Sequence, residues 1–199
     1  MPDYPDLYLM RHGQTVWNAE GRMQGRMNSN LTDLGTAQAH AQSRLVSGIE
    51  AARYASPQGR ARQTAQIVFD GQPYQEDERL CEIDIGGFSG QRYEDIKAQN
   101  AQLFAGSQFG WYDGAPQGEG FDSLRARCRS FLDDLTGPAL IVTHGITLRM
   151  MRVVALGLPM ERFAEMAQFQ GAVQVIRNGQ HEIWQEDESL RLATLDGNS

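Results

Sequence analysis

Two short apolar runs, each followed almost at once by a histidine and a glycine, constrain the fold of this chain more than any other feature. Leu7–Met10 leads into Arg11-His12-Gly13, and the Ala-Leu-Ile-Val run at 139–142 leads into Thr143-His144-Gly145. Undivided apolar runs of this length are typical of strands buried on both faces of a sheet. Such strands occur mainly in parallel sheets covered by helices, so the chain is predicted to be an α/β protein.

The segments between these runs carry the periodicity of amphipathic helices. After Thr32, a residue type that caps helix N-termini, apolar residues recur at positions 34, 37, 41 and 45. A second helix is expected to be capped by Asp122, with apolar residues at 124, 128, 131, 132 and 135 facing inward. Further elements are expected as a strand at 54–56 and helices over 60–69, 93–103 and 145–156.

The C-terminal part contains a hairpin signal. Asn178-Gly179 lies between apolar residues at 173 and 175 and apolar residues at 183 and 184, a pattern typical of a type I′ turn between antiparallel strands. We find no internal repeat or linker, and 199 residues correspond to about one domain. The prediction is a single domain over 1–199, a three-layer sandwich with a mostly parallel central sheet, helices on both faces and an antiparallel edge hairpin.

The charge balance bears on the expected partners. The chain has 25 acidic and 18 basic residues, a net charge of −7, and its only lysine is Lys97. A general nucleic-acid binder needs a basic excess, so nucleic acid is not an expected partner. Arginine nevertheless suits bidentate binding of phosphate or carboxylate at a local site.

Neither a membrane segment nor a signal peptide is predicted. The longest apolar stretch, Ile146–Met160, contains Arg149 and Arg152, and charged side chains are costly inside a bilayer. The N-terminus lacks a basic region followed by a long apolar core. Cys81 and Cys128 are too few for a disulfide scaffold and are expected in or near the core. The expected compartment is the cytoplasm.

Basic side chains follow three of the predicted strands. Ligands of open parallel sheets bind beyond the carboxyl ends of the strands, and here those ends precede His12, Arg60 and His144. Arg60 and Arg62 lie in the first turn of a predicted helix, where positive charge is unfavourable unless an anion is bound. Guanidinium forks match phosphate oxygens, so Arg11 and Arg60 with the two histidines describe a phosphate pocket.

Several segments, in order along the chain, resemble the histidine phosphatase superfamily, which includes the cofactor-dependent phosphoglycerate mutases. Residues 7–18 resemble its opening motif, residues 56–65 (Ser-Pro-Gln-Gly-Arg-Ala-Arg-Gln-Thr-Ala) its second, and residues 142–145 its third. Residues 31–35 and 80–86 also match in order. The resemblance covers roughly residues 7–156.

The resemblance implies roles for the pocket residues. His12 would be the nucleophile that carries a transient phosphoryl group, while Arg11, Arg60 and His144 would bind the phosphoryl oxygens. Glu82 would protonate the leaving oxygen and then accept a proton from the attacking water. The resemblance implies no metal ion and no cofactor.

Other residues are secondary candidates. Substrate binding is assigned to Asn18, Thr15, Gln24, Gly25 and the backbone N–H of Gly145. Gln14 is a further candidate for the pocket lining, and Asp84 is the alternative acid. Glu119 and Phe121 lie where the family often has a substrate-side loop.

Two positions depart from the family's pattern. Gln58 stands where the family usually has leucine, which we interpret as a packing change. Ser89-Gly90 stands where phosphatase members often have Glu-Gly, so the detail of the substrate-side region over residues 86–121 is left open.

Three functions are compatible with these residues. The first is a metal-independent phosphomonoester hydrolase that acts through a phosphohistidine on a small phosphorylated metabolite. The second is a cofactor-dependent phosphoglycerate mutase, which is disfavoured because the acidic segment 185–191 would repel a bisphosphate. The third is a catalytically silent phospho-ligand-binding module, although the chain retains both the nucleophile and the acid. The physiological substrate is left open, as is a homodimer through the hairpin edge.

Overall fold

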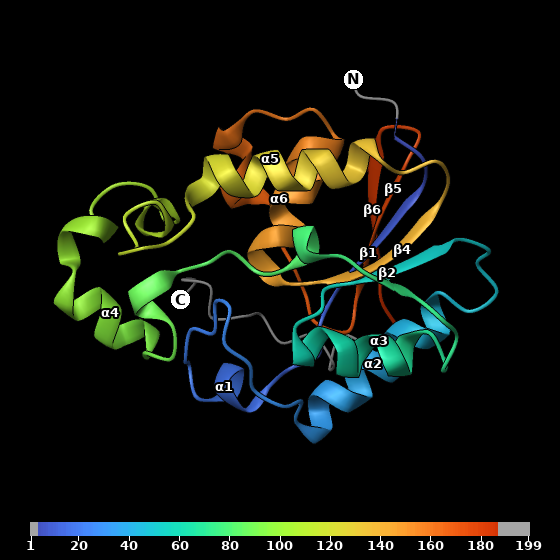
Figure 1. Cartoon of the computed structure of the whole chain (residues 1–199), viewed down its shortest axis with the longest axis horizontal. Coiled ribbons are helices and arrows are strands. Elements are labelled where there is room, and N and C mark those ends of the chain that lie inside the picture. The colour runs from blue at the N-terminus through green and yellow to red at the C-terminus, as the bar shows by residue number, and fades with distance from the viewer. Residues whose placement is uncertain (1–3, 187–199) are drawn as a thin grey trace.

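The computed structural model describes residues 4–186 and contains a six-stranded sheet in the order β3-β2-β4-β1-β5-β6 (Figure 1). The strands are β1 (Leu7–Arg11), β2 (Ala52–Ala55), β3 (Gln75–Glu76), β4 (Ala139–Thr143), β5 (Val173–Arg177) and β6 (Gln180–Trp184). The pairs among β1 to β4 are parallel, whereas β5 is antiparallel to β1 and β6 is antiparallel to β5. The predicted mostly parallel sheet with an edge hairpin is therefore confirmed.

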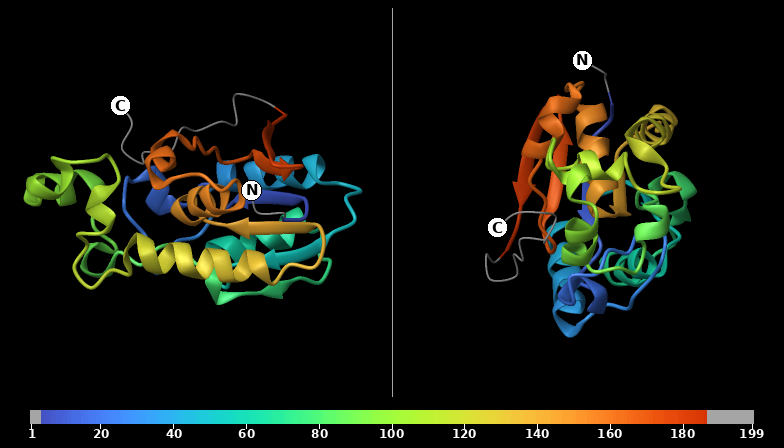
Figure 2. Two further views of the ribbon diagram at one scale, coloured as in Figure 1. Left: turned by 90° about the horizontal axis from the view of Figure 1, so that it is seen from above. Right: turned by 90° about the vertical axis from the view of Figure 1, so that its left-hand side faces the viewer.

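Helices cover both faces of the sheet (Figures 1 and 2). One face carries α2 (Asp33–Leu45) and α3 (Gly59–Val68), and the other carries α5 (Gly120–Asp133) and α6 (Gly145–Ala155). Two shorter helices, α1 (Val16–Ala19) and α4 (Tyr93–Gln99), belong to the connections. Five short 3-10 helices also occur among the described residues: Glu78–Leu80, Gly86–Phe88, Ala101–Phe104, Gly110–Tyr112 and Met160–Glu165.

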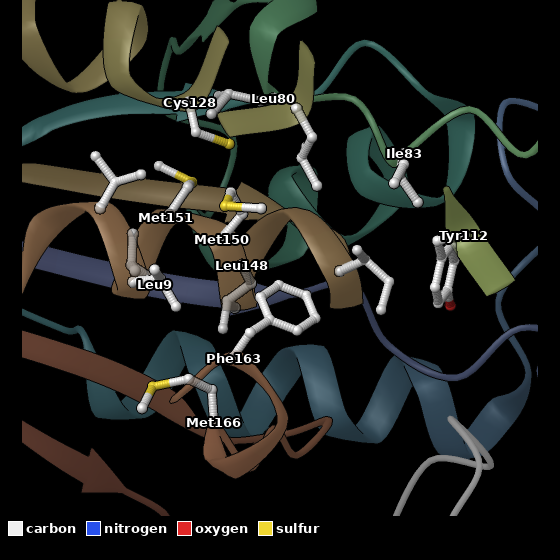
Figure 3. Packing of buried hydrophobic residues seen from close by; sticks show 14 of the residues in the cluster. Leu9, Leu80, Ile83, Tyr112, Cys128, Leu148, Met150, Met151, Phe163 and Met166 are labelled. Atoms are coloured by element: carbon white, nitrogen blue, oxygen red, sulfur yellow. The ribbon is translucent and has the colours of Figure 1, made fainter. Parts of the chain in front are cut away.

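Alternate residues of the central strands enter two separate cores. Leu7 and Leu9 of β1 belong to the cluster that includes side chains of α5 and α6, whereas Tyr8 and Met10 belong to the cluster that includes α2 and α3. Figure 3 shows part of the first cluster, with Leu9 near Leu148 and the methionines of α6. Every residue of β1 and β4 is buried, which is why both runs are apolar without interruption.

Several local predictions are confirmed. The Thr32 hydroxyl accepts a hydrogen bond from the Gly35 N–H at 3.0 Å and caps α2. Asn178 and Gly179 have φ values of 51° and 69°, as a type I′ turn requires. Cys81 and Cys128 are both buried and free.

Two predicted helix boundaries are wrong. Asp122 does not cap α5, because the helix begins at Gly120, and the Phe121 N–H bonds to the side chain of Asp113 at 2.7 Å. The predicted helix over 93–103 is two elements, since Asn100 leaves the helical region (φ −131°, ψ 41°) between α4 and a 3-10 helix.

Within residues 4–186, no helix combines the length and the hydropathy needed to cross a bilayer.

Candidate active site

His12 lies directly after β1 and is 2% exposed. Its backbone N–H donates to the Thr143 carbonyl at 2.9 Å, which continues the pairing of β1 with β4. The ring Nδ1 lies 2.7 Å from the Gly13 carbonyl oxygen. A carbonyl only accepts, so Nδ1 carries the proton and Nε2 keeps its lone pair. Arg60 Nε donates to this Nε2 at 3.2 Å.

The loop after His12 packs directly on the first turn of α2. A Cβ atom on Gly13 would lie 2.1 Å from the Gly35 carbonyl oxygen, and a Cβ on Gly35 would lie 2.0 Å from the Gln14 carbonyl oxygen. Only glycine permits so close an approach of two backbones. The Thr32 hydroxyl also donates to Gln14 Oε1 at 2.8 Å, so Gln14 supports the loop here and is absent from the described pocket lining.

His144 precedes α6 and is fully buried, with its ring centroid 5.2 Å from that of His12. Its Nε2 lies 2.7 Å from the Ser56 hydroxyl oxygen. The Gln58 N–H donates to the same oxygen at 3.3 Å. Nδ1 of His144 is buried and has no hydrogen-bond partner among residues 4–186. When Ser56 donates to Nε2, Nδ1 carries the proton and can donate to an anion.

Both histidines are held neutral. Burial, followed by the positive charges of Arg60 and Arg11, lowers the pKa of His12 well below its ordinary value. Burial is also the main cause that lowers the pKa of His144, with Arg60 and then His12 as further causes. A neutral imidazole has one unprotonated nitrogen, in His12 Nε2, and this is the form that can act as a nucleophile.

Arg60, in the first turn of α3, is 1% exposed and fixes the loop beside the histidines. Its Nη1 donates to the Met27 carbonyl at 2.6 Å and its Nη2 to the Gly25 carbonyl at 3.0 Å. Its backbone N–H donates to Asn28 Oδ1 at 2.7 Å. Burial lowers the pKa of Arg60 to about 10, against the raising effect of Glu82, so the guanidinium remains charged at neutral pH.

Glu82 follows the 3-10 helix Glu78–Leu80, and its carboxylate contacts the N-terminus of α6. Its Oε1 accepts from the N–H groups of Ile83 and Thr147, both at 3.0 Å, and its Oε2 accepts from the Ile146 N–H at 3.2 Å. The backbone N–H of Glu82 donates to Gln58 Oε1 at 2.7 Å. The free N–H groups of a helix N-terminus stabilise a negative charge, which explains the position of this carboxylate.

His12, Arg60 and Glu82 line one pocket at the carboxyl ends of β1, β2 and β4. The described lining consists of Arg11, His12, Asn18, Arg22, Met23, Gln24, Gly25, Arg60, Glu82, Ile83, Ile85, Tyr112 and Ile146. Seven of the predicted site residues are therefore brought together: Arg11, His12, Asn18, Gln24, Gly25, Arg60 and Glu82.

Three predicted site residues lie behind this lining. His144 and Thr15 are both fully buried, and Thr15 caps α1 through a hydrogen bond from the Asn18 N–H at 3.2 Å. Gly145 begins α6, where an added Cβ would lie 2.8 Å from the Gln168 side chain. Asn18 Oδ1 accepts from the Thr15 N–H at 3.1 Å, so its NH₂ group is the end that can donate to a ligand.

Arg62 shares the first turn of α3 with Arg60 but does not belong to the described pocket lining. Its guanidinium pairs with Glu76 at 2.9 Å. Asp84, the alternative acid, is also absent from that lining and accepts from the Gly86 N–H at 2.8 Å.

The substrate-side region is only partly as expected. Glu119 pairs with Arg127 at 2.7 Å and with Arg26 at 3.5 Å. Phe121 packs on the ring of Phe163, and neither Glu119 nor Phe121 belongs to the described lining. Tyr112 is the residue of this region that reaches the pocket near Ile83 and Ile146.

Sequence reasoning missed several polar residues that support the site. Ser56 holds His144, Thr147 holds Glu82, and Gln170 Nε2 donates to the His12 carbonyl at 3.1 Å. The interpretation of Gln58 as a packing change is wrong, because its side chain forms hydrogen bonds at both ends. The departure from leucine at this position was the available signal.

Among residues 4–186, no three side chains of histidine, cysteine, aspartate or glutamate are grouped so that they could hold a metal ion.

Comparison with known proteins agrees with this geometry. The profile of the histidine phosphatase superfamily (branch 1) matches residues 7–187. An Erwinia tasmaniensis protein named "Probable phosphoglycerate mutase GpmB" is 35% identical over 162 residues, which cover 77% of this chain and 75% of that protein.

Solved structures share the fold of this chain. YhfR from Bacillus stearothermophilus is 32% identical, with 92% of this chain and 96% of that chain covered and a TM-score of 0.76. A mycobacterial glucosyl-3-phosphoglycerate phosphatase is 24% identical, with 92% and 100% covered and a TM-score of 0.80, and this likeness shows the fold alone.

Proposed function

The chain belongs to the histidine phosphatase superfamily, and we propose that it is a metal-independent phosphomonoester hydrolase for a small phosphorylated metabolite. The observation that carries the proposal is the buried, neutral His12, whose Nε2 lone pair lies 3.2 Å from Arg60 Nε in the pocket that Glu82 also lines. This arrangement supports the proposal, because a phosphoryl group bound in the pocket would have a nucleophile, a cation and a carboxyl group around it.

In the first step, His12 Nε2 donates its electron pair to the phosphorus atom and the bond from phosphorus to the ester oxygen breaks. Glu82, in its carboxylic acid form, transfers a proton to the leaving oxygen, which departs as an alcohol. Arg11, Arg60 and His144 Nδ1 donate hydrogen bonds to the phosphoryl oxygens, where charge develops in the transition state.

In the second step, the Glu82 carboxylate takes a proton from water, and the water oxygen attacks the phosphorus atom. The bond from Nε2 to phosphorus breaks, its electron pair returns to His12, and inorganic phosphate leaves. Glu82 ends the cycle protonated, as it began, so the sum of both steps is hydrolysis of the ester.

The rest of the pocket favours an organic group without a second anion. Beside the proposed phosphate-binding residues, its described lining includes the apolar or aromatic side chains of Met23, Ile83, Ile85, Tyr112 and Ile146. Arg22 lines it too, but its Nε bonds to Glu20 at 2.8 Å and its Nη1 to the Gly90 carbonyl at 3.0 Å. A phosphoglycerate also carries a carboxylate, which needs a cation that is not already paired.

A phosphoglycerate mutase is the second candidate, favoured by the name of the 35% identical relative. The acidic segment 185–191, whose charge disfavours a bisphosphate, lies mostly outside the described residues. The two candidates differ in the fate of the phosphoryl group, which goes to water in a hydrolase and back to the organic acid in a mutase.

The test is hydrolysis of para-nitrophenyl phosphate by the wild type and by His12→Ala, each with and without EDTA. Turnover that survives EDTA and disappears in the variant supports the proposal, whereas turnover that EDTA abolishes contradicts metal independence. Isomerisation of 3-phosphoglycerate without release of phosphate would support the mutase. Vanadate binding with neither activity would indicate a silent binding module.

A further inference from the structure

Gln58 connects the pocket loop to the candidate acid, although it is absent from the described pocket lining. It occupies the N-cap position of α3, where its side chain makes no capping hydrogen bond. Instead, its Nε2 donates to the Gly25 carbonyl at 3.0 Å and its Oε1 accepts from the Glu82 N–H at 2.7 Å. One side-chain amide therefore holds two segments that both line the pocket.

Gly25 has a backbone conformation that other residues rarely adopt, and it is closely packed against Ile85 and Ser89. Its φ is +49°, and an added Cβ would lie 2.7 Å from Ile85 Cγ1 and 2.9 Å from Ser89 Oγ. Its carbonyl also accepts from Arg60 Nη2 at 3.0 Å, so the donors from Gln58 and Arg60 share one acceptor. The position of the loop is thus tied to the amide of Gln58 and to the cation beside His12.

Glu82 is held at both ends. Its carboxylate is bonded to N–H groups at the start of α6, and its backbone N–H is bonded to Gln58. Without the Gln58 contact, the backbone N–H loses its bond, and the segment that carries the carboxyl group can shift relative to the pocket loop. Proton transfer requires hydrogen-bond distance between acid and leaving oxygen, so it depends strongly on this placement.

We propose that Gln58 is a positioning residue that sets the place of Glu82 relative to the Met23–Asn28 loop, so that the carboxyl group reaches the leaving oxygen. This inference rests on the proposed hydrolase function. It assigns Gln58 an effect on proton donation, because Gln58 bonds to the backbone of Glu82 and has no contact with the side chain of His12 among its hydrogen bonds.

The effect should depend on the leaving group. An ester of a simple alcohol needs its leaving oxygen protonated, whereas nitrophenolate is a much weaker base and leaves without that help. A variant that misplaces only the acid should therefore lose activity on β-glycerol phosphate and keep most of it on para-nitrophenyl phosphate. A variant that merely disturbs folding should affect both esters alike.

The experiment compares Gln58→Met, which keeps the length of the side chain without its hydrogen bonds, with Gln58→Glu. Glutamate can still accept from the Glu82 N–H but cannot donate to Gly25. Gln63→Met is the matched control, because Gln63 lies on the same helix, accepts from the Leu31 N–H at 3.1 Å and is absent from the described lining.

We expect Gln58→Met to reduce kcat on β-glycerol phosphate by about 10–100-fold and kcat on para-nitrophenyl phosphate by less than about threefold. Gln58→Glu retains the bond to the Glu82 N–H and loses the bond to Gly25, so it should recover only part of the loss on β-glycerol phosphate. Gln63→Met should leave the ratio of the two rates unchanged. Equal losses on both esters, or no loss on either, would overturn the proposal. Thermal unfolding of each variant establishes that it is folded, and if Gln58→Met is not, Gln58→Glu and Gln58→Ala are compared in the same way.

Failure of the proposed function gives a different result. If the wild type hydrolyses neither ester nor any member of a panel of metabolite phosphates, the hydrolase proposal fails, and the role of Gln58 is measured by vanadate binding. Weaker vanadate binding in Gln58→Met than in Gln63→Met would retain the positioning of the Met23–Asn28 loop. Equal binding would overturn that as well.

Discussion

Arg60→Lys tests whether the site needs a planar fork or only a positive charge. Three different nitrogens of Arg60 donate to three acceptors: His12 Nε2 at 3.2 Å, the Gly25 carbonyl at 3.0 Å and the Met27 carbonyl at 2.6 Å. A lysine has a single nitrogen and cannot reach acceptors arranged around a guanidinium plane. We therefore expect the lysine variant to keep one of the three hydrogen bonds.

The loss in stability follows from these contacts. A hydrogen bond to a charged group contributes about 1.5–3 kcal/mol, so the loss of two gives ~3–6 kcal/mol before relaxation. Water can reach the freed carbonyls, and we expect the lower end of that range, about 3 kcal/mol. For a chain of this size, ~2–4 °C per kcal/mol corresponds to a decrease in Tm of roughly 6–12 °C.

The effect on turnover has a second cause. Burial lowers the pKa of Arg60 to about 10. The same burial would act on a lysine whose ordinary pKa is only about 10.4, and would bring it toward neutrality near physiological pH. Loss of a preorganised donor to the transition state costs about 10²–10³-fold, which is the expected decrease in kcat/KM on para-nitrophenyl phosphate.

The assay is thermal unfolding together with steady-state kinetics for Arg60→Lys and for the control Arg62→Lys. Arg62 lies in the same helix turn but pairs with Glu76 at the surface, so its substitution should change both quantities very little. The reasoning is refuted if Arg60→Lys keeps kcat/KM within about threefold of wild type at an unchanged Tm, because charge alone would then suffice.

Three further perturbations test other parts of the site. Glu82→Gln should slow hydrolysis of β-glycerol phosphate by about 10²–10⁴-fold, because an amide cannot donate the proton. Vanadate affinity should be retained, and unchanged turnover would assign the acid role to another group. Gly35→Ala should abolish turnover or folding, because its Cβ would lie 2.0 Å from the Gln14 carbonyl oxygen; circular dichroism and activity check this, and a fully active variant would contradict it. The free energy of unfolding should decrease as pH falls below about 6.5, because the lowered pKa values of His12 and His144 mean that the unfolded chain binds protons there and the folded chain does not. Each histidine contributes a limiting slope of ~1.4 kcal/mol per pH unit to the free energy of unfolding. Urea unfolding between about pH 7.5 and 5.5 should therefore show a smaller slope in His144→Gln than in the wild type. Equal slopes would argue against a neutral His144.

Features determined by neighbouring residues were predictable from the sequence. The Thr32 cap, the Asn178-Gly179 turn and the two undivided strands depend on residues within a few positions of each other. The meeting of His12 and His144 followed from a rule of sheet topology, because the carboxyl ends of adjacent parallel strands lie side by side.

Contacts between distant segments were not predictable in this way. The bond from Glu82 to Gln58 joins residues 24 positions apart, and nothing in the local pattern of either residue specifies the partner. The divergence of Arg60 and Arg62 was predictable from helix geometry, because side chains two positions apart are rotated by about 200° around the helix axis. The Asp122 prediction failed because a loop residue, Asp113, bonds to the N-terminus of α5 from outside the helix.

The N-terminal end of α6 positions two of the proposed catalytic groups. His144 lies at the N-cap of α6, and the N–H groups of Ile146 and Thr147 hold the Glu82 carboxylate. The positions of His144 and of the Glu82 carboxylate therefore both depend on α6, whereas His12 directly follows β1.

The C-terminal part of α6 is anchored by a buried arginine. Arg152 donates to the Met166 carbonyl and to the Gln174 side chain, both at 2.9 Å. A substitution of Arg152 is expected to shift α6, and with it His144 and the N–H groups that hold the Glu82 carboxylate, relative to His12. Substitutions well away from the pocket are thus expected to change the geometry of the reaction although every reacting residue is unchanged.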